Sequence, residues 1–148
     1  MKNLFRLMQK SDYESVYSLW MKCKNMGFNN VDDSEKSISK YLERNSRTCF
    51  VCVRNEKVVG VILSGHDGRR GFIHHLAVDP DFRRQGIATE LLRQALNALK
   101  KEEISKVGLF VFAYNSDGNA FWEKQRFTLR TDINYRNKAL VELIRQDT

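Results

Sequence analysis

Residues 72–99 have the sequence FIHHLAVDPDFRRQGIATELLRQALNAL, and this stretch decides the fold of the 148-residue chain. Its first seven residues are mostly apolar and are followed by Asp79 and Pro80. Because proline has no N–H group to give to a sheet ladder, the apolar run predicts a strand that ends there. From Ile87 onward apolar residues recur at helical spacing, so they predict a long helix with one buried stripe. A basic turn joins strand and helix.

That turn predicts a site for an anion. The backbone N–H groups of residues 84–89 lie at the start of the helix, where they lack intrahelical partners. The positive end of the helix dipole lies at the same place. Gly86 allows the backbone to approach a ligand without a Cβ in the way. Arg83 and Arg84 add positive charge at the same place. A phosphate or pyrophosphate is therefore the natural ligand.

Length, charge and composition limit the other possibilities. The composition is uniform and the length suits one domain, so we predict a single domain over residues 1–148. No apolar run is long enough to span a bilayer, and none follows the start as in a signal peptide, which predicts a cytoplasmic protein without a membrane partner. The net charge of +7 indicates an anionic partner: a nucleic acid, a membrane surface or a phosphorylated cofactor.

Three cysteines are too few, and odd in number, for a disulfide scaffold. Cys49 and Cys52 have the spacing of a redox or metal motif, but they lie in a run that predicts a strand. Three residues of strand span about 10 Å and place the two side chains on opposite faces. We therefore expect packing thiols and no metal site.

The chain is predicted to form a mixed, mostly antiparallel sheet flanked by helices, an α/β (α+β) fold. The first part holds a strand at residues 3–8, a helix started by a capping box at Ser11 to Glu14, and a second helix from Asp32 or Asp33. Two strands, 48–53 and 58–64, then form a hairpin.

The strand at 72–78, the long helix and a strand at 106–113 predict a right-handed crossover between parallel strands. A short helix over 119–124 and two closing strands, 127–133 and 139–144, complete the order β-α-α-β-β-β-α-β-α-β-β. In such sheets a ligand binds at the carboxyl ends of the strands, which is where the anion turn lies.

These features resemble the GCN5-related N-acetyltransferase (GNAT) superfamily, and the likeness covers nearly the whole chain. The family signature, Arg/Gln-x-x-Gly-x-Gly/Ala, is matched by residues 83–88. Its context matches too, because Leu-Ala-Val-Asp-Pro precedes it and an amphipathic helix, a strand, Asn115 and a short aromatic helix follow. Within the superfamily the chain looks most like small bacterial acetyltransferases.

The resemblance implies acetyl-CoA as acetyl donor and names the residues that bind it. It implies that the turn holds the pyrophosphate and that the backbone of the preceding strand binds the pantetheine arm and polarises the thioester carbonyl. Asn115 and Trp122 match positions near the cofactor. The full predicted set of cofactor-binding residues is Leu76, Ala77, Val78, Arg83, Arg84, Gln85, Gly86, Ile87, Ala88, Thr89, Asn115 and Trp122.

Acetyl transfer to an amine requires the neutral amine, so a base has to take a proton. His74 is the first candidate: it lies two residues before Leu76, which predicts the same face of the strand, whereas His75 points to the other face. Arylalkylamine acetyltransferases resemble this chain in carrying a histidine there. The other interpretation of His74 is a half-buried structural histidine. His66, in a polar turn, is a weaker candidate.

Two positions depart from the family pattern. Trp122 stands where a tyrosine commonly protonates the leaving thiolate, and an indole N–H cannot do so; it either contacts the cofactor or packs in the core. Arg126 stands where a glycine usually ends the helix. Since a left-handed conformation would cost arginine roughly 1 kcal/mol, we expect a different helix exit there.

The acceptor is the least defined part of the prediction. Asp32 and Asp33 lie in the region that borders the acceptor pocket in the family, where they either bind a cationic amine or cap a helix. The leading prediction is an acetyl-CoA-dependent N-acetyltransferase acting on a primary amine of a small molecule or protein. The alternative is a non-catalytic acyl-CoA sensor or partner-binding module. Nucleic-acid binding rests on charge alone and is not expected, and a homodimer stays open.

Overall fold

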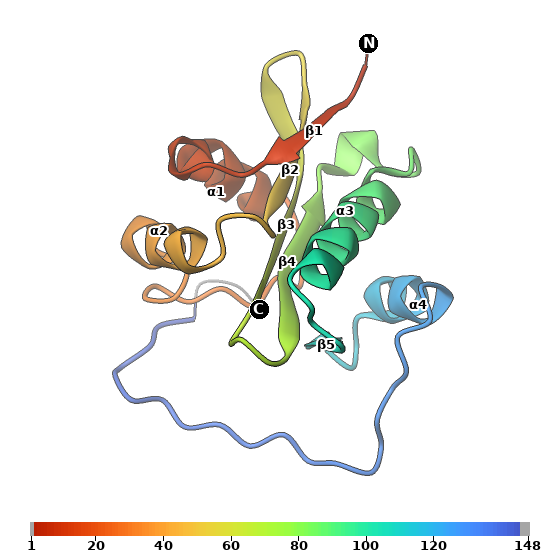
Figure 1. The fold of residues 1–148 in the computed structure, drawn as a ribbon. Helices are drawn as coiled ribbons and strands as arrows, with labels where there is room; N and C mark the ends of the chain where they lie inside the picture. The colour runs from red at the N-terminus through yellow and green to blue at the C-terminus, as the bar shows by residue number, and fades with distance from the viewer. Residues whose placement is uncertain (1, 146–148) are drawn as a thin grey trace.

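A computed structural model describes residues 2–145 of the chain. Five strands form one sheet, with helices on both of its faces (Figure 1). The strands are β1 Leu4–Leu7, β2 Phe50–Arg54, β3 Lys57–His66, β4 Gly71–Val78 and β5 Val107–Leu109. The helices are α1 Tyr13–Met21, α2 Glu35–Arg44, α3 Ile87–Lys101 and α4 Ser116–Lys124, with short 3-10 turns η1 at Lys10–Asp12 and η2 at Pro80–Phe82.

The strands lie in the order β1-β2-β3-β4-β5. The first four pair antiparallel, while β4 and β5 are parallel and are connected through α3, which confirms the predicted parallel pairing. Helices α1 and α2 cover one face of the sheet, over a core that includes Trp20, Phe28 and Leu42. Helix α3 covers the other face, where Ile62 and Leu91 are buried. The predicted fold class, a mostly antiparallel mixed sheet flanked by helices, is confirmed.

The entry into α1 differs from the prediction. Asp12, which is 8% exposed, accepts a hydrogen bond from the N–H of Gln9 at 2.8 Å. Both of its carboxylate oxygens also contact the guanidinium of Arg6, each at 2.8 Å. The expected capping box beginning at Ser11 is therefore wrong: the box runs from Gln9 to Asp12, at the start of η1, and the bidentate ion pair with Arg6 of β1 holds Asp12 in place.

The prediction that Cys49 and Cys52 pack on opposite faces of the sheet is confirmed. Cys49 belongs to the core under α1 and α2, whereas Cys52 belongs to the core under α3, so the two side chains lie on opposite faces of the sheet. Both are free thiols, and burial raises the pKa of Cys49 to about 12 and that of Cys52 to about 11. Among residues 2–145, no group of three or more His, Cys, Asp or Glu side chains could hold a metal ion.

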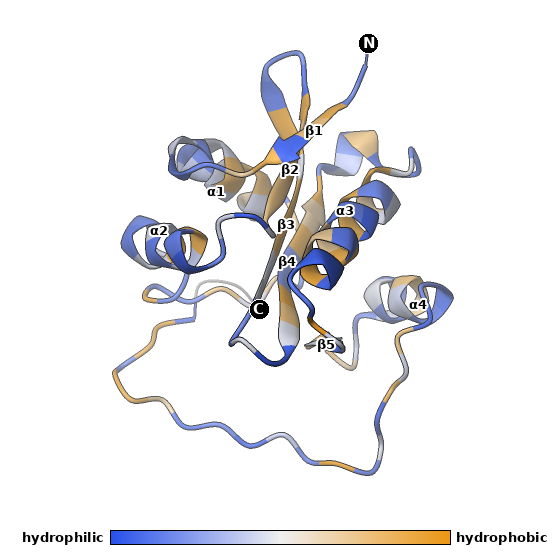
Figure 2. Cartoon of the chain, viewed as in Figure 1, coloured by the Kyte–Doolittle hydropathy of each residue, from blue (hydrophilic) through white to orange (hydrophobic). Residues whose placement is uncertain are grey.

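The end of the sheet is shorter than predicted. Strand β5 has three residues rather than the eight expected over 106–113, and the closing strands at 127–133 and 139–144 do not form. The reason lies in β5, since three residues offer a further strand very few backbone partners. The whole segment 128–144 runs outside the sheet, with hydrophobic and hydrophilic residues alternating along it (Figures 1 and 2).

This segment touches the body at two points. Tyr135 packs on Phe110, with ring centroids 4.2 Å apart. Near its end, Asn30 donates its backbone N–H to the carbonyl of Ile144 at 3.0 Å, and Arg145 lies over the ring of Phe112 at 4.9 Å. The segment therefore links the end of α4 to the loop between α1 and α2.

The exit from α4 also differs from the prediction, because Arg126 does adopt the left-handed conformation, with φ of 66°. The N–H of Phe127 bonds to the carbonyl of Trp122 at 2.9 Å, and the N–H of Arg126 bonds to the carbonyl of Glu123 at 3.0 Å. These two bonds form a Schellman motif. The rings of Trp122 and Phe127 supply its hydrophobic contact, with centroids 4.9 Å apart. The motif outweighs the preference of arginine for negative φ.

Arg126→Gly is expected to raise the free energy of unfolding by about 1 kcal/mol, because glycine adopts this φ without strain. Lys124→Gly, inside the last turn of α4, is the matched control and should lower the free energy of unfolding by a similar amount. Urea unfolding of both variants measures the two values. A destabilised Arg126→Gly variant would contradict the role given to this helix exit.

Candidate functional site

Strand β4 contains a bulge that places its two histidines on one face. His75 has φ of 47°, and the register with β3 shifts there: Leu63 pairs with His74 and Val61 pairs with Ala77. Two residues, His75 and Leu76, thus stand opposite one residue of β3. A bulge of this kind interrupts the alternation of side chains along a strand.

The prediction that His74 and Leu76 share a face is therefore wrong, and so is the prediction that His75 points away from His74. The ring of His74 packs against Tyr41 of α2, with centroids 5.7 Å apart. The ring of His75 packs against Trp20 of α1 at 5.0 Å, on the same side of the sheet. Leu76 packs in the core under α3.

The bulge lies where β4 and β5 separate. Their parallel pairing runs from Gly71 and Val107 to Ile73 and Leu109, whereas β4 continues to Val78. On the β5 side, the backbone of β4 after Ile73 therefore has no strand beside it within residues 2–145. Such an edge pairs with an extended chain as a further strand would.

The predicted anion turn opens beside this edge. Gly86 precedes the first residue of α3 with φ of 78°, and a Cβ built on it would meet no atom within 4 Å. Arg84 also has a left-handed backbone, with φ of 62°. The N–H groups of the first turn of α3 have no intrahelical acceptor and lie in this open space. The turn thus has the shape and polarity that a phosphate group requires.

The side chains around the turn hold it in place. Arg83 donates its Nε–H to the carbonyl of Val78 at 3.3 Å. Gln85 accepts a hydrogen bond from Arg54 of β2 at 2.9 Å. The hydroxyl of Thr89 lies 3.5 Å from Nε2 of Gln125, so the end of α4 borders the first turn of α3.

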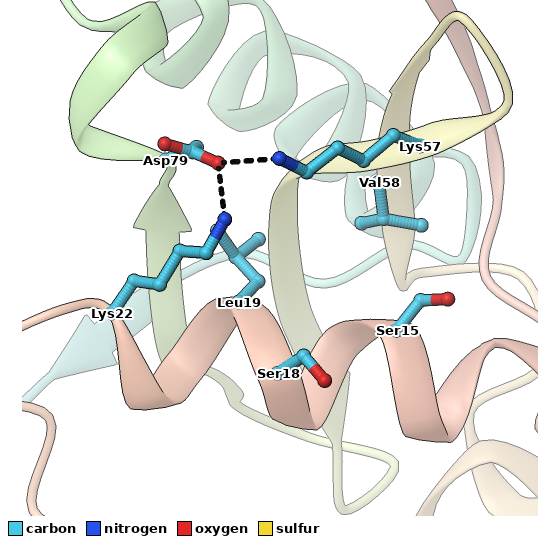
Figure 3. A pocket seen from close by; sticks show the side chains of 7 residues that line it. All are labelled: Ser15, Ser18, Leu19, Lys22, Lys57, Val58 and Asp79. Carbon is cyan, nitrogen blue, oxygen red and sulfur yellow. Dashed lines mark hydrogen bonds and ion pairs between the residues drawn. The ribbon is translucent and has the colours of Figure 1, made fainter.

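Asp79 fixes the path from β4 into the turn. It is 1% exposed, accepts the N–H of Asp81 at 2.9 Å, and lies 3.2 Å from Nζ of Lys22 and 3.5 Å from Nζ of Lys57 (Figure 3). Burial would raise the pKa of Asp79, but the N–H bond and the two ammonium groups outweigh it and hold the pKa below its usual value. The sequence predicts only that a strand ends at Asp79.

A cavity of about 160 Å³ lies next to Asp79, between α1 and β3. Its two lysines both point at the Asp79 carboxylate in Figure 3. Because both lysines already pair with that carboxylate, we infer that they hold Asp79 in place and do not bind a ligand in this cavity. The residues that line it are Ser15, Ser18, Leu19, Lys22, Lys57, Val58 and Asp79.

His74 lies at the mouth of the opening and is exposed to solvent. Its ring is flanked by Tyr41 and by Phe72, whose centroid is 4.9 Å away. Desolvation by these neighbours, and then the nearby ring of His75, lower the pKa of His74 to about 4. The imidazole is therefore neutral near pH 7 and has a lone pair that can accept a proton.

His75 and Asp33 form a buried pair that sequence reasoning missed. Nε2 of His75 lies 2.6 Å from Oδ1 of Asp33, and the two side chains are 13% and 6% exposed. The other carboxylate oxygen accepts the N–H of Asn29 at 2.8 Å. The prediction that Asp33 caps the second helix is wrong, because Ser34 caps α2 by accepting the N–H of Ser37 at 3.2 Å. A pattern of adjacent histidines gave no sign of this pairing.

His66 is unsuited to act as a base. Its Nδ1 accepts the N–H of Gly68 at 2.9 Å, and its Nε2 lies 2.7 Å from the carboxylate of Glu102. The ring is thus the tautomer that donates from Nε2, and both of its nitrogens are engaged. Of the two candidates, His74 and His66, only His74 is exposed and has a ring nitrogen available.

The last two predicted site residues lie on α4. Asn115 is the N-cap of this helix, and its side-chain oxygen accepts the N–H of Gly118 at 2.9 Å. Trp122 is half-buried and packs against Phe121 and Phe127 on the α3 side of the sheet. The structure therefore gives both residues a structural role, and it places their helix next to the anion turn.

A sheet that opens beside a parallel crossover, with an open helix start at the opening, is suited to an extended phosphorylated ligand. Comparison with known proteins specifies the class. Residues 13–127 match the acetyltransferase (GNAT) family. An acetyltransferase of Sodalis glossinidius is 30% identical over 137 residues, which cover 93% of this chain and 95% of that protein.

Solved structures show the same fold. Ard1 of Thermoplasma volcanium has a TM-score of 0.78 at 22% identity, and the match covers 88% of this chain and 86% of that one. The PaiA N-acetyltransferase of Thermoplasma acidophilum, in complex with coenzyme A, has a TM-score of 0.72 at 18% identity, covering 84% and 89%.

The chain belongs to the GNAT acetyltransferase family. It is an acetyltransferase, and acetyl-CoA is its acetyl donor. No helix within residues 2–145 is long and apolar enough to cross a membrane.

The buried pair gives a stability prediction with a matched control. Asp33→Ala leaves the His75 ring and the N–H of Asn29 without their acceptor, so it should lower the free energy of unfolding by about 3 kcal/mol. Asp32→Ala removes an exposed carboxylate and should change it by less than about 0.5 kcal/mol. Urea unfolding compares the two variants, and equal effects would contradict the burial and pairing of Asp33.

Proposed function

We propose that the protein transfers the acetyl group of acetyl-CoA to a primary amine of a small molecule or protein by direct attack of the amine on the thioester. One observation supports this most strongly: a neutral, exposed imidazole, His74, lies where β4 leaves β5. The protein carries an amine-deprotonating group and a cofactor slot side by side.

The described residues fit acetyl-CoA. The left-handed turn of residues 83–89 binds the pyrophosphate with N–H groups and two arginines, and Gly86 leaves the approach clear. The free backbone edge of Leu76 to Val78 binds the pantetheine arm. Asn115 and Trp122 border the slot from α4. When bound, the cofactor supplies an acetyl group activated as a thioester.

His74 takes the proton that the amine must lose. As the N–C bond forms and the C–S bond breaks, the amine proton moves to the free ring nitrogen of His74, and coenzyme A leaves as thiolate. A thiol has a pKa of about 8.5, so the thiolate leaves without a dedicated acid and water supplies its proton. Trp122 is therefore compatible with transfer although its indole cannot act as an acid.

The turn can be tested at Gly86. Alanine at φ of 78° costs about 1 kcal/mol of strain and places a methyl group over the N–H groups that bind phosphate, so Gly86→Ala should weaken acetyl-CoA binding about tenfold. Gly68→Ala is the matched control, because Gly68 has φ of 92° and equally open surroundings in the β3–β4 turn. Calorimetric titration with acetyl-CoA should show loss of affinity only in Gly86→Ala. Equal affinities would contradict the placement of the pyrophosphate.

The base can be tested at His74. His74→Ala should lower kcat by about 100-fold and leave acetyl-CoA affinity unchanged. Because the pKa of His74 is depressed to about 4, the imidazole is already unprotonated above roughly pH 5, so the wild-type profile of kcat/KM should show no imidazole limb near pH 6.5. Unchanged turnover in His74→Ala would remove it as the base.

A second candidate function is a non-catalytic acyl-CoA sensor. Trp122 favours it, since the indole replaces a possible proton donor and packs in a Schellman contact with Phe127. Turnover distinguishes the two functions, because a sensor binds acetyl-CoA without releasing free thiol in the presence of amines.

Three further expectations from the sequence stay predictions, namely a single domain over residues 1–148, a cytoplasmic location and no nucleic-acid partner, and one question stays open, whether the protein forms a homodimer. The exposed apolar side chains beyond α4 are compatible with a homodimer. They are Leu129, Ile133, Tyr135, Leu140, Val141, Leu143 and Ile144.

A further inference from the structure

An open groove lies beside His74, between α2 and the turn that joins β3 to β4. Its volume is about 330 Å³, which suits a small molecule or the end of a peptide. Tyr41, Phe72 and His74 form its aromatic wall, with Gly71 at the start of the strand pair β4–β5. The groove therefore gives an amine access to the imidazole assigned as base. This inference rests on the proposed function, since it concerns the acceptor of that same site.

The groove carries two guanidinium groups from different elements. Arg44 is the last residue of α2, and Arg70 precedes β4 in the β3–β4 turn. Both side chains are exposed, and within residues 2–145 neither has an ion-pair or hydrogen-bond partner for its guanidinium. Unpartnered arginines are well suited to bind a carboxylate or a phosphate.

The other titratable groups of the groove leave this positive charge uncompensated. Asp67 is the one carboxylate among the described lining residues, and its Oδ1 already accepts the N–H groups of Arg69 and Arg70 at 2.9 and 2.8 Å. His66 is engaged at both nitrogens, and desolvation raises the pKa of Tyr41, which stays a neutral phenol. With two arginines and one aspartate, the lining has a net charge of +1 when both imidazoles are neutral.

From this charge distribution we infer that the acceptor is an amine that also carries an anionic group, a carboxylate or a phosphate, which Arg44 and Arg70 bind while the amine reaches His74. A polycationic acceptor would be repelled by the two guanidinium groups. The described lining residues contain no pair of free carboxylates that could bind its ammonium groups. An acidic group also holds the amine in one orientation, which favours attack on a fixed thioester.

Matched amines test the inference in the full chain with saturating acetyl-CoA, with release of free thiol as the readout. The pairs are 4-aminobutyrate with 4-aminobutyramide, and O-phosphoethanolamine with ethanolamine, so that carboxylate and phosphate are tested separately; spermidine represents polycations. At least one acidic member should have a kcat/KM about tenfold or more above its neutral partner and above spermidine.

Variants then locate the anionic group. Arg70→Gln and Arg44→Gln should each raise KM for the preferred acidic amine about tenfold with kcat and the KM for acetyl-CoA unchanged, and Arg70→Lys should recover part of the loss. Arg69→Gln is the matched control, because Arg69 is adjacent and exposed but does not line the groove. Its KM should stay within about twofold of wild type.

The outcomes separate this inference from the proposed function. Turnover of neutral amines or spermidine with no preference for an acidic partner would overturn the inference and leave the proposed function standing. Equal effects of Arg70→Gln and Arg69→Gln would also overturn it. Acetyl-CoA binding without turnover of any amine would overturn the proposed function, and this inference with it.

Discussion

The left-handed backbone at His75 is the constraint on which the site depends. A regular strand conformation at this position would continue the alternation of side chains, whereas φ of 47° at His75 places one extra residue opposite Ile62 and interrupts it. Such a conformation persists only where surrounding contacts hold it. Here the ring of His75 is fixed by the carboxylate of Asp33 and by Trp20 and Phe28.

Two consequences of the bulge coincide in space. Strand β4 separates from β5 after Ile73, which leaves an unpaired backbone edge where we propose that the cofactor binds, and His74 turns to the same face as His75, toward α2. The pair with Asp33 also ties the loop between α1 and α2 to this strand. The candidate base and the loop between α1 and α2 are therefore held by one local distortion, beside the proposed cofactor site. Asp79 orients the chain from β4 into the turn at Gly86.

The parts of the fold that follow from local periodicity could be predicted from the sequence. The apolar stripe of α3 and the turn at Gly86 are each encoded within a few residues, and the long helix that connects β4 to β5 indicates that these two strands are parallel. The sheet faces on which His74 and Leu76 lie could not be predicted. Side chains alternate only along a strand without a bulge, and two adjacent histidines do not indicate that a bulge is present. The buried partner of His75 lies 42 residues away, and Asp33 looked like an ordinary helix cap.

The errors in the last part of the chain have two different causes. The apolar alternation after Phe127 is a strand pattern, but a strand needs an edge to pair with, and β5 provides three residues. Arg126 adopts a conformation that its own preference opposes, because two backbone hydrogen bonds and the contact between Trp122 and Phe127 favour it. The first outcome was decided by tertiary pairing, which local sequence does not encode, and the second by a local helix-ending motif that outweighs the preference of a single residue.

Hydrogen exchange of backbone amides, with and without acetyl-CoA, tests the central claim most directly. If the free edge of β4 and the start of α3 hold the cofactor, amides of residues 76–78 and 84–89 should exchange more slowly when acetyl-CoA is bound, while those of the β2–β3 hairpin stay unchanged. Protection confined to other segments, with residues 76–89 unaffected, would contradict the account.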